Sequence, residues 1–130
     1  MAVYLDTSAF VKLVVSEPES RALRSFLTRR RTRHVSSAML RTEALRAVRH
    51  GGAEALANTR SALKTVELVA VTDSILDAAG TLEPRVLRTL VAIHLATALA
   101  LGDDLDVIVT YDARMAEGSR LLGLEAASPG

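Results

Sequence analysis

The sequence predicts an α/β fold, a parallel sheet of four to five strands with helices on both faces. Three observations favour it. Strand-like and helix-like segments alternate along the whole chain, no hairpin signal joins two strands, and the strands are apolar throughout. Because we find no repeat, linker or low-complexity tract, we expect one domain over residues 1–130.

Short apolar runs predict the strands. The first, AVYL, ends at an acid, and the run DVIVT is continuously apolar, which is typical of a strand covered on both faces. The expected strands cover residues 2–5, 34–37, 67–71, 106–110 and, as a weak closing strand, 124–128.

Capping signals bound the helices between these strands. Pro18 suits the first turn of a second helix, and Pro84 suits the opening of the long apolar helix. Ser37 and Asp73 are suitable N-caps, and a glycine pair ends the helix that follows Ser37. The expected helices cover residues 7–17, 17–27, 38–50, 53–66, 74–82, 84–101 and 111–123.

Composition excludes several classes of site. The chain has no cysteine, so disulfides and thiolate metal sites are excluded. Its formal net charge is only +1, so any nucleic-acid-binding surface must be local. The N-terminus has no basic leader, and the apolar run near residue 90 is short for a membrane span and contains Arg88 and His94. We therefore expect a soluble, cytoplasmic protein.

Three acids are expected at one edge of the sheet. Asp6 and Asp112 each lie just past a strand, and ligands of open parallel sheets bind beyond the carboxyl ends of the strands. Each could equally be the N-cap of the next helix. Glu43 lies within the apolar stripe of its helix, where a carboxylate must be paired or bind a metal. The alternative for Glu43 is an ion pair with Arg41 or Arg46.

Three carboxylates without cysteine suit a hard cation, Mg²⁺ or Mn²⁺. Such clusters commonly serve phosphoryl transfer. The chain contains neither a P-loop nor a dinucleotide-binding glycine motif. A hydrolase of the haloacid dehalogenase type is disfavoured, because Thr7 and Ser8 follow Asp6 where that class has D-x-D.

Four ordered blocks give the chain a family resemblance over nearly its whole length. It resembles the PIN-domain ribonucleases, and among them the VapC-type toxins of bacterial toxin–antitoxin pairs. The resemblance implies a metal-dependent endoribonuclease that cuts a structured RNA, such as a tRNA or rRNA. It also implies a VapB-type antitoxin and frequent homodimers. The blocks are VYLDTSAFVKL, SSAMLRTEALRA, LRTLVAIHLATAL and VIVTYDARM.

The resemblance assigns roles to particular residues. Asp6, Glu43 and Asp112 match three of the family's four metal-site acids. Thr7 and Ser8 match the hydroxyl residues after the first acid, and we expect Ser8 to reach the site. These matches predict catalytic and metal-binding roles for Asp6, Glu43 and Asp112, with Ser8 beside them.

The remaining acid of the family pattern is absent. The family helix reads L-D-A-x-H-L, and here Val91 stands where the family has the aspartate. His94 remains, three residues later and on roughly the same side of the helix; the alternative for it is a core histidine bonded to backbone. Because Asp103, Asp104 and Asp106 are expected at the opposite edge, they cannot replace the missing acid. We expect weak metal binding and little cleavage.

Two origins of Val91 are open, an introduced inactivating substitution or a natural degenerate member. Two functions are open as well. One is an Mg²⁺-dependent ribonuclease disabled at residue 91, and the other is a non-catalytic module that binds an antitoxin or RNA.

Further features have two interpretations each. Arg29, Arg30 and Arg31 belong to the one dense basic run, which also contains Arg24, Arg33 and His34. They either end a solvated helix or contact RNA phosphates. The helices before residue 51 are candidates for an antitoxin groove. Glu117 is either an outer acid of the site or a solvated helix residue.

Overall fold

The computed structural model describes residues 1–130, which form one five-stranded parallel sheet in the order β3-β2-β1-β4-β5. The first strand of the chain therefore lies at the centre. The strands are β1 (Ala2–Leu5), β2 (Arg33–Ser37), β3 (Glu67–Val69), β4 (Leu105–Val109) and β5 (Ala126–Ala127).

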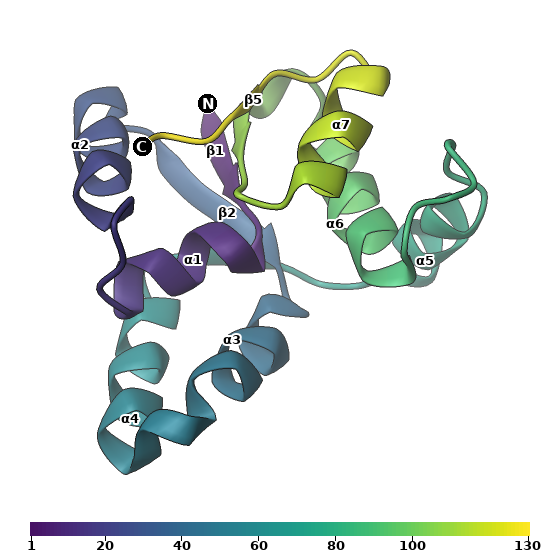
Figure 1. The fold of residues 1–130 in the computed structure, drawn as a ribbon. Helices are drawn as coiled ribbons and strands as arrows, with labels where there is room; N and C mark the ends of the chain where they lie inside the picture. The colour runs from purple at the N-terminus through teal and green to yellow at the C-terminus, as the bar shows by residue number, and fades with distance from the viewer.

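Helices cover both faces of the sheet, as the sequence predicts (Figure 1). One face carries α1 (Thr7–Val14), α2 (Ser20–Arg30), α3 (Leu40–Val48) and α4 (Gly52–Leu63). The other side carries α5 (Asp73–Gly80), α6 (Thr89–Ala100) and α7 (Ala113–Leu121). Short 3₁₀ turns lie at Arg49–Gly51 and Gly102–Asp104.

The central strand supplies side chains to two hydrophobic cores. Because side chains alternate along a strand, Val3 and Leu5 join Phe10 in the core under α1–α4. Ala2 and Tyr4 point to the other face, where they join the core with Leu95 of α6. All six side chains are completely buried. None of the helices combines the length and the apolarity that crossing a bilayer requires.

Several predicted boundaries are wrong. The long helix begins at Thr89 and not at Pro84, because the chain forms an isolated turn there (Leu87 N–H to Pro84 O, 3.1 Å) and is extended at Arg88. The N-cap of α5 is Thr72 and not Asp73, since the Thr72 hydroxyl accepts the Ile75 N–H.

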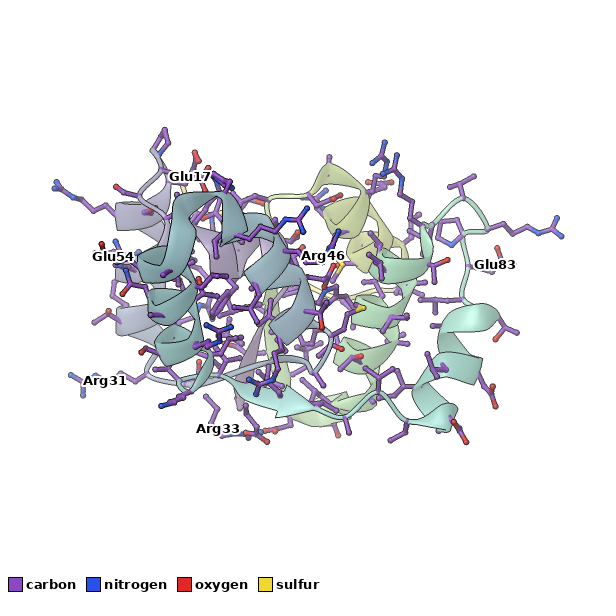
Figure 2. The ribbon with its side chains drawn as sticks, turned by 90° about the horizontal axis from the view of Figure 1, so that it is seen from below. Glu17, Arg31, Arg33, Arg46, Glu54 and Glu83 are labelled. Atoms are coloured by element: carbon purple, nitrogen blue, oxygen red, sulfur yellow. The ribbon has the colours of Figure 1, made fainter.

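The other boundary errors concern helix and strand lengths. Ser37 accepts the Met39 N–H, but α3 starts only at Leu40. The second helix begins at Ser20, three residues after the predicted start, and the closing strand has only two residues. The strands all run the same way, so the residues that follow β1, β2 and β4 lie at one edge of the sheet. Figure 2 looks onto this edge.

Candidate active site

A small cavity of about 90 Å³ lies at the edge where the strands end. It combines carboxylates, hydroxyls, an imidazole and apolar side chains from the ends of β1 and β4 and from α1, α3, α6 and α7. Its lining residues are Asp6, Thr7, Ser8, Glu43, Leu90, Val91, His94, Asp112 and Met115. The three predicted acids therefore border one cavity, together with Val91.

Asp6 is buried, with 5 % of its surface exposed, and both of its oxygens accept hydrogen bonds. Oδ1 accepts the Ser8 hydroxyl at 2.7 Å and the Ala9 N–H at 3.0 Å, while Oδ2 accepts the Thr110 hydroxyl. Burial raises the pKa of Asp6, although the bonds from Thr110 and Ser8 oppose the rise. The N-cap interpretation of Asp6 is confirmed, and the same side chain still borders the cavity.

Glu43 is held from two sides. Its Oε1 accepts the Thr7 hydroxyl at 2.8 Å and lies 2.8 Å from His94 Nε2. Burial raises the pKa of Glu43, but the hydrogen bonds from His94 and Thr7 outweigh it and lower the pKa overall. The alternative of an ion pair with an arginine of α3 is wrong, because His94 is the basic partner of Glu43.

His94 is buried and bonds to side chains at both ring nitrogens. Nδ1 lies 2.6 Å from the Tyr4 hydroxyl, and Nε2 faces Glu43. The predicted core position of His94 is therefore confirmed, but its bonds are to side chains and not to backbone. His94 connects the buried central strand to the acidic wall of the cavity.

Asp112 is the N-cap of α7 and is half-buried. Its Oδ1 accepts the backbone N–H groups of Arg114 at 2.8 Å and Met115 at 3.1 Å. No protein donor contacts its Oδ2. The capping interpretation of Asp112 is thus confirmed, and one oxygen stays available to a ligand.

The donor chemistry around the cavity fits a hard divalent cation. Three carboxylates border it, and both Glu43 and Asp112 have one oxygen without a protein donor. However, no three acid or histidine side chains lie close enough together to form a preformed ligand set. Val91 contributes an apolar side chain to the wall. Metal binding by Asp6, Glu43 and Asp112 stays a prediction.

Sequence reasoning missed Thr110 and Tyr4 and underrated Thr7. The Thr110 hydroxyl donates to Asp6 and accepts the Asp112 N–H at 3.0 Å, so it connects two of the acids. The sequence did offer a signal for Thr110, a hydroxyl residue that ends an apolar strand just before Tyr111 and Asp112. Tyr4 gave none, because an aromatic residue in a strand is ordinarily a core residue.

The predicted basic run lies away from the cavity. It ends α2 and begins β2, at the edge where the strands start. Arg30 pairs with Asp106 at 2.7 Å, and Arg33 pairs with Asp104 and Glu67 at 2.7 and 3.1 Å. These pairs also place the aspartates near residue 105 opposite the site, as predicted. Arg29 and Arg31 are exposed there, and in Figure 2 Arg31 and Arg33 lie at the margin.

Glu117 does not border the cavity. It is exposed on α7 and lies 4.0 Å from Arg120. This placement agrees with a solvated helix residue and not with an outer acid of the site.

A central parallel sheet with acids at its carboxyl edge is the arrangement that defines the class of this protein. The family model of the PIN domain matches residues 3–121. Among solved structures, VapC20 of Mycobacterium tuberculosis, a sarcin–ricin loop cleaving toxin, superposes with a TM-score of 0.76 at 15 % identity, covering 98 % of this chain and 99 % of that one. A toxin–antitoxin complex from Klebsiella pneumoniae gives a TM-score of 0.76 at 20 % identity, covering 98 % of each chain.

Curated relatives narrow the class further. Ribonuclease VapC46 of Mycobacterium tuberculosis is 51 % identical over 130 residues and covers 98 % of both chains. Ribonuclease VapC47 of the same species is 38 % identical over 132 residues, covering 98 % of this chain and 97 % of its own. The chain belongs to the VapC ribonuclease toxins of the PIN-domain family.

Proposed function

We propose that this chain is a divalent-metal-dependent endoribonuclease that cuts a structured RNA, a tRNA or an rRNA, and that Val91 weakens it. The observation that carries the proposal is the meeting of Asp6, Glu43 and Asp112 around one cavity in a VapC-type chain. When bound, Mg²⁺ or Mn²⁺ supplies an activated water and neutralises charge on the phosphate. Incubating the purified protein with total cellular RNA, with Mg²⁺ or with EDTA, tests it.

The side chains at this site have two kinds of role, binding the cation and positioning the carboxylates. Asp6, Glu43 and Asp112 hold the cation, and Ser8 and Thr110 fix both oxygens of Asp6. The Ser8 hydroxyl also accepts the Tyr111 N–H at 2.8 Å. Ser8 therefore holds the turn before Asp112 against the turn after β1, which keeps the two aspartates at one edge.

RNA phosphates are expected to bind beside the cavity and not at the predicted basic run. Arg46, Arg88 and Arg114 each lie within three residues of a cavity-lining residue, on α3, before α6 and on α7. All three are exposed and form no ion pair, unlike Arg30 and Arg33 at the opposite edge. Figure 2 shows Arg46 between α3 and the helices α6 and α7, on the side where the strands end. Free arginines are suited to phosphate contacts.

Replacing Arg46, Arg88 and Arg114 together with alanine should weaken RNA binding at least about tenfold and reduce its dependence on salt. The matched control is the pair Arg29→Ala and Arg31→Ala, which removes exposed charge at the opposite edge. Filter binding of a labelled structured RNA at two salt concentrations measures the effect. Equal losses for both sets would contradict a phosphate-binding role specific to the cavity rim.

A VapB-type antitoxin is the expected protein partner. A VapBC2 complex from Rickettsia felis, bound to promoter DNA, is a structural neighbour with a TM-score of 0.73 at 14 % identity, covering 100 % of both chains. The proposed antitoxin surface is the helices α1–α3 beside the cavity. We also propose a cytoplasmic location, since such a toxin acts on cellular RNA.

A homodimer is proposed through the surface of α5, α6 and the segment between them. Leu76 and Leu90 are half-exposed, and Val86 is 86 % exposed. Leu76 lines an open groove of about 570 Å³, Leu90 lines the acid cavity, and Val86 lies between two residues that line the groove. Exposed apolar side chains gathered in one region mark an interaction surface.

Leu76→Glu combined with Val86→Glu should shift the protein to a monomer, because a desolvated carboxylate disfavours the interface. Light scattering after size exclusion, over a range of concentrations, measures the change. The control is Leu121→Glu, since Leu121 is an exposed leucine on α7, away from this surface. A wild-type chain that stays monomeric at high concentration would refute the dimer.

A non-catalytic module that binds an antitoxin or RNA is the second candidate. The observation that favours it is the apolar wall at Val91 together with the lack of a preformed ligand set. This candidate requires that an acid restored at residue 91 brings no cleavage.

A further inference from the structure

A buried line of hydrogen bonds connects the centre of the sheet to the wall of the cavity. The Tyr4 hydroxyl lies 2.6 Å from His94 Nδ1, and His94 Nε2 lies 2.8 Å from Glu43 Oε1. Tyr4 is completely buried and His94 is 4 % exposed, so water does not compete for the bond between them. Their rings also meet edge to face, with centroids 5.7 Å apart.

The direction of these bonds follows from the donors available. A buried phenol keeps its proton at neutral pH, and the one side-chain acceptor bonded to the Tyr4 hydroxyl is His94 Nδ1. If Tyr4 donates to Nδ1, a neutral imidazole must carry its own proton on Nε2. Nε2 then donates to Glu43. The opposite arrangement would set the Nε2 lone pair against the Glu43 carboxylate, which has no proton to donate, and this is costly.

Glu43 therefore receives two donors on one oxygen. His94 Nε2 and the Thr7 hydroxyl both point to Oε1, and no protein group donates to Oε2. A glutamate side chain loses considerable rotamer freedom when it is fixed in one conformation. In this site Glu43 has already lost its rotamer freedom before a ligand binds, because His94 of α6 and Thr7 of α1 both hold Oε1.

We propose that Tyr4 and His94 are positioning residues that fix Glu43 through Oε1 and leave Oε2 as the oxygen offered to a cation. Tyr4 acts through His94, by setting which ring nitrogen carries the proton. Such outer partners orient ligands in other metal sites and strengthen binding there. The proposal deepens the proposed metal-dependent function and rests on it for the role of Oε2.

The first experiment measures the imidazole directly. Long-range ¹H–¹⁵N spectra of the labelled protein at neutral pH should show His94 as the Nε2–H tautomer, assigned with His94→Gln. Tyr4→Phe, which removes the donor to Nδ1, should reduce the share of this form. The control is Ser119→Ala, which removes another completely buried hydroxyl, bonded to Met115 O. An Nδ1–H or doubly protonated His94 in the wild-type chain would overturn the proposal.

The second experiment measures Mn²⁺ affinity by calorimetry, with each substitution made in the Val91→Asp chain. Tyr4→Phe and His94→Leu should weaken binding roughly 10- to 100-fold. His94→Gln, which keeps an amide donor near Oε1, should recover part of the loss, and Ser119→Ala should cause none. Losses equal to that of Ser119→Ala would overturn the positioning role. If no form binds Mn²⁺, the metal-dependent function fails, while the tautomer still decides whether Tyr4 orients His94.

Discussion

Val91→Asp is expected to raise Mg²⁺-dependent RNA cleavage on the order of 100-fold, corresponding to about 3 kcal/mol of transition-state stabilisation. Val91 lines the cavity with Asp6, Glu43 and Asp112. An aspartate there would add an oxygen ligand where the wall is now apolar. It would also add charge to a site whose carboxylates repel one another without a cation.

This repulsion predicts a signature in stability. The Val91→Asp chain should unfold more easily than the wild type in EDTA and regain stability when Mg²⁺ is added, because a ligand stabilises the state that binds it. Thermal unfolding with and without Mg²⁺ measures the difference. Val91→Asn is the matched control, since asparagine has nearly the same shape as aspartate but carries no charge. It should gain neither cleavage nor the Mg²⁺-dependent stabilisation.

Growth of cells that express the Val91→Asp chain is an independent test of the same substitution. Expression of the Val91→Asp chain should arrest growth, and coexpression of its antitoxin should relieve the arrest. A Val91→Asp protein that folds normally but cuts no RNA and arrests no growth would favour the non-catalytic module.

Asp112→Asn, made in the Val91→Asp chain, should lower cleavage more than about 100-fold with little change in stability. Asp112 has two roles that this substitution separates. Its Oδ1 caps α7, and asparagine caps a helix about as well as aspartate does. The carboxylate charge and the free Oδ2 belong to the metal site, and asparagine removes both.

The control for this prediction is Asp73→Asn in the same background. Asp73 is an exposed acid in the first turn of α5, away from the cavity, and its loss should leave cleavage unchanged. Cleavage rates on a structured RNA and thermal unfolding provide the two readouts. Loss of folding in Asp112→Asn, or full activity without the charge, would each contradict the two-role interpretation.

The sequence could predict what depends on local pattern. The alternation of strands and helices predicted the parallel sheet, and the two acids just past strands were placed correctly at its edge. The start of α6 could not be predicted, because Pro84 permits a helix without requiring one. Leu82 and Leu87 instead pack against the second core from outside a helix. Apolar residues near a helix were indistinguishable from apolar residues within it.

The hydrogen bonds around the acids could not be predicted from local sequence patterns, because they join residues far apart in the chain. Thr110 and Asp6 are 104 residues apart, and Tyr4 and His94 are 90 apart. Each of these residues has an ordinary local interpretation, as a strand end, a cap or a core residue. The chemistry arises only when the sheet brings them together.

The central position of β1 also has a consequence for synthesis of the chain. The first strand pairs with β4, and the Asp6 carboxylate is held by Thr110 just beyond β4, 104 residues further along the chain. A nascent chain therefore emerges from the ribosome with its middle strand lacking one neighbour. Until β4 follows, the cavity has neither Asp112 nor the hydroxyl that fixes Asp6. The cavity is therefore complete only after β4 and the turn that follows it have been made.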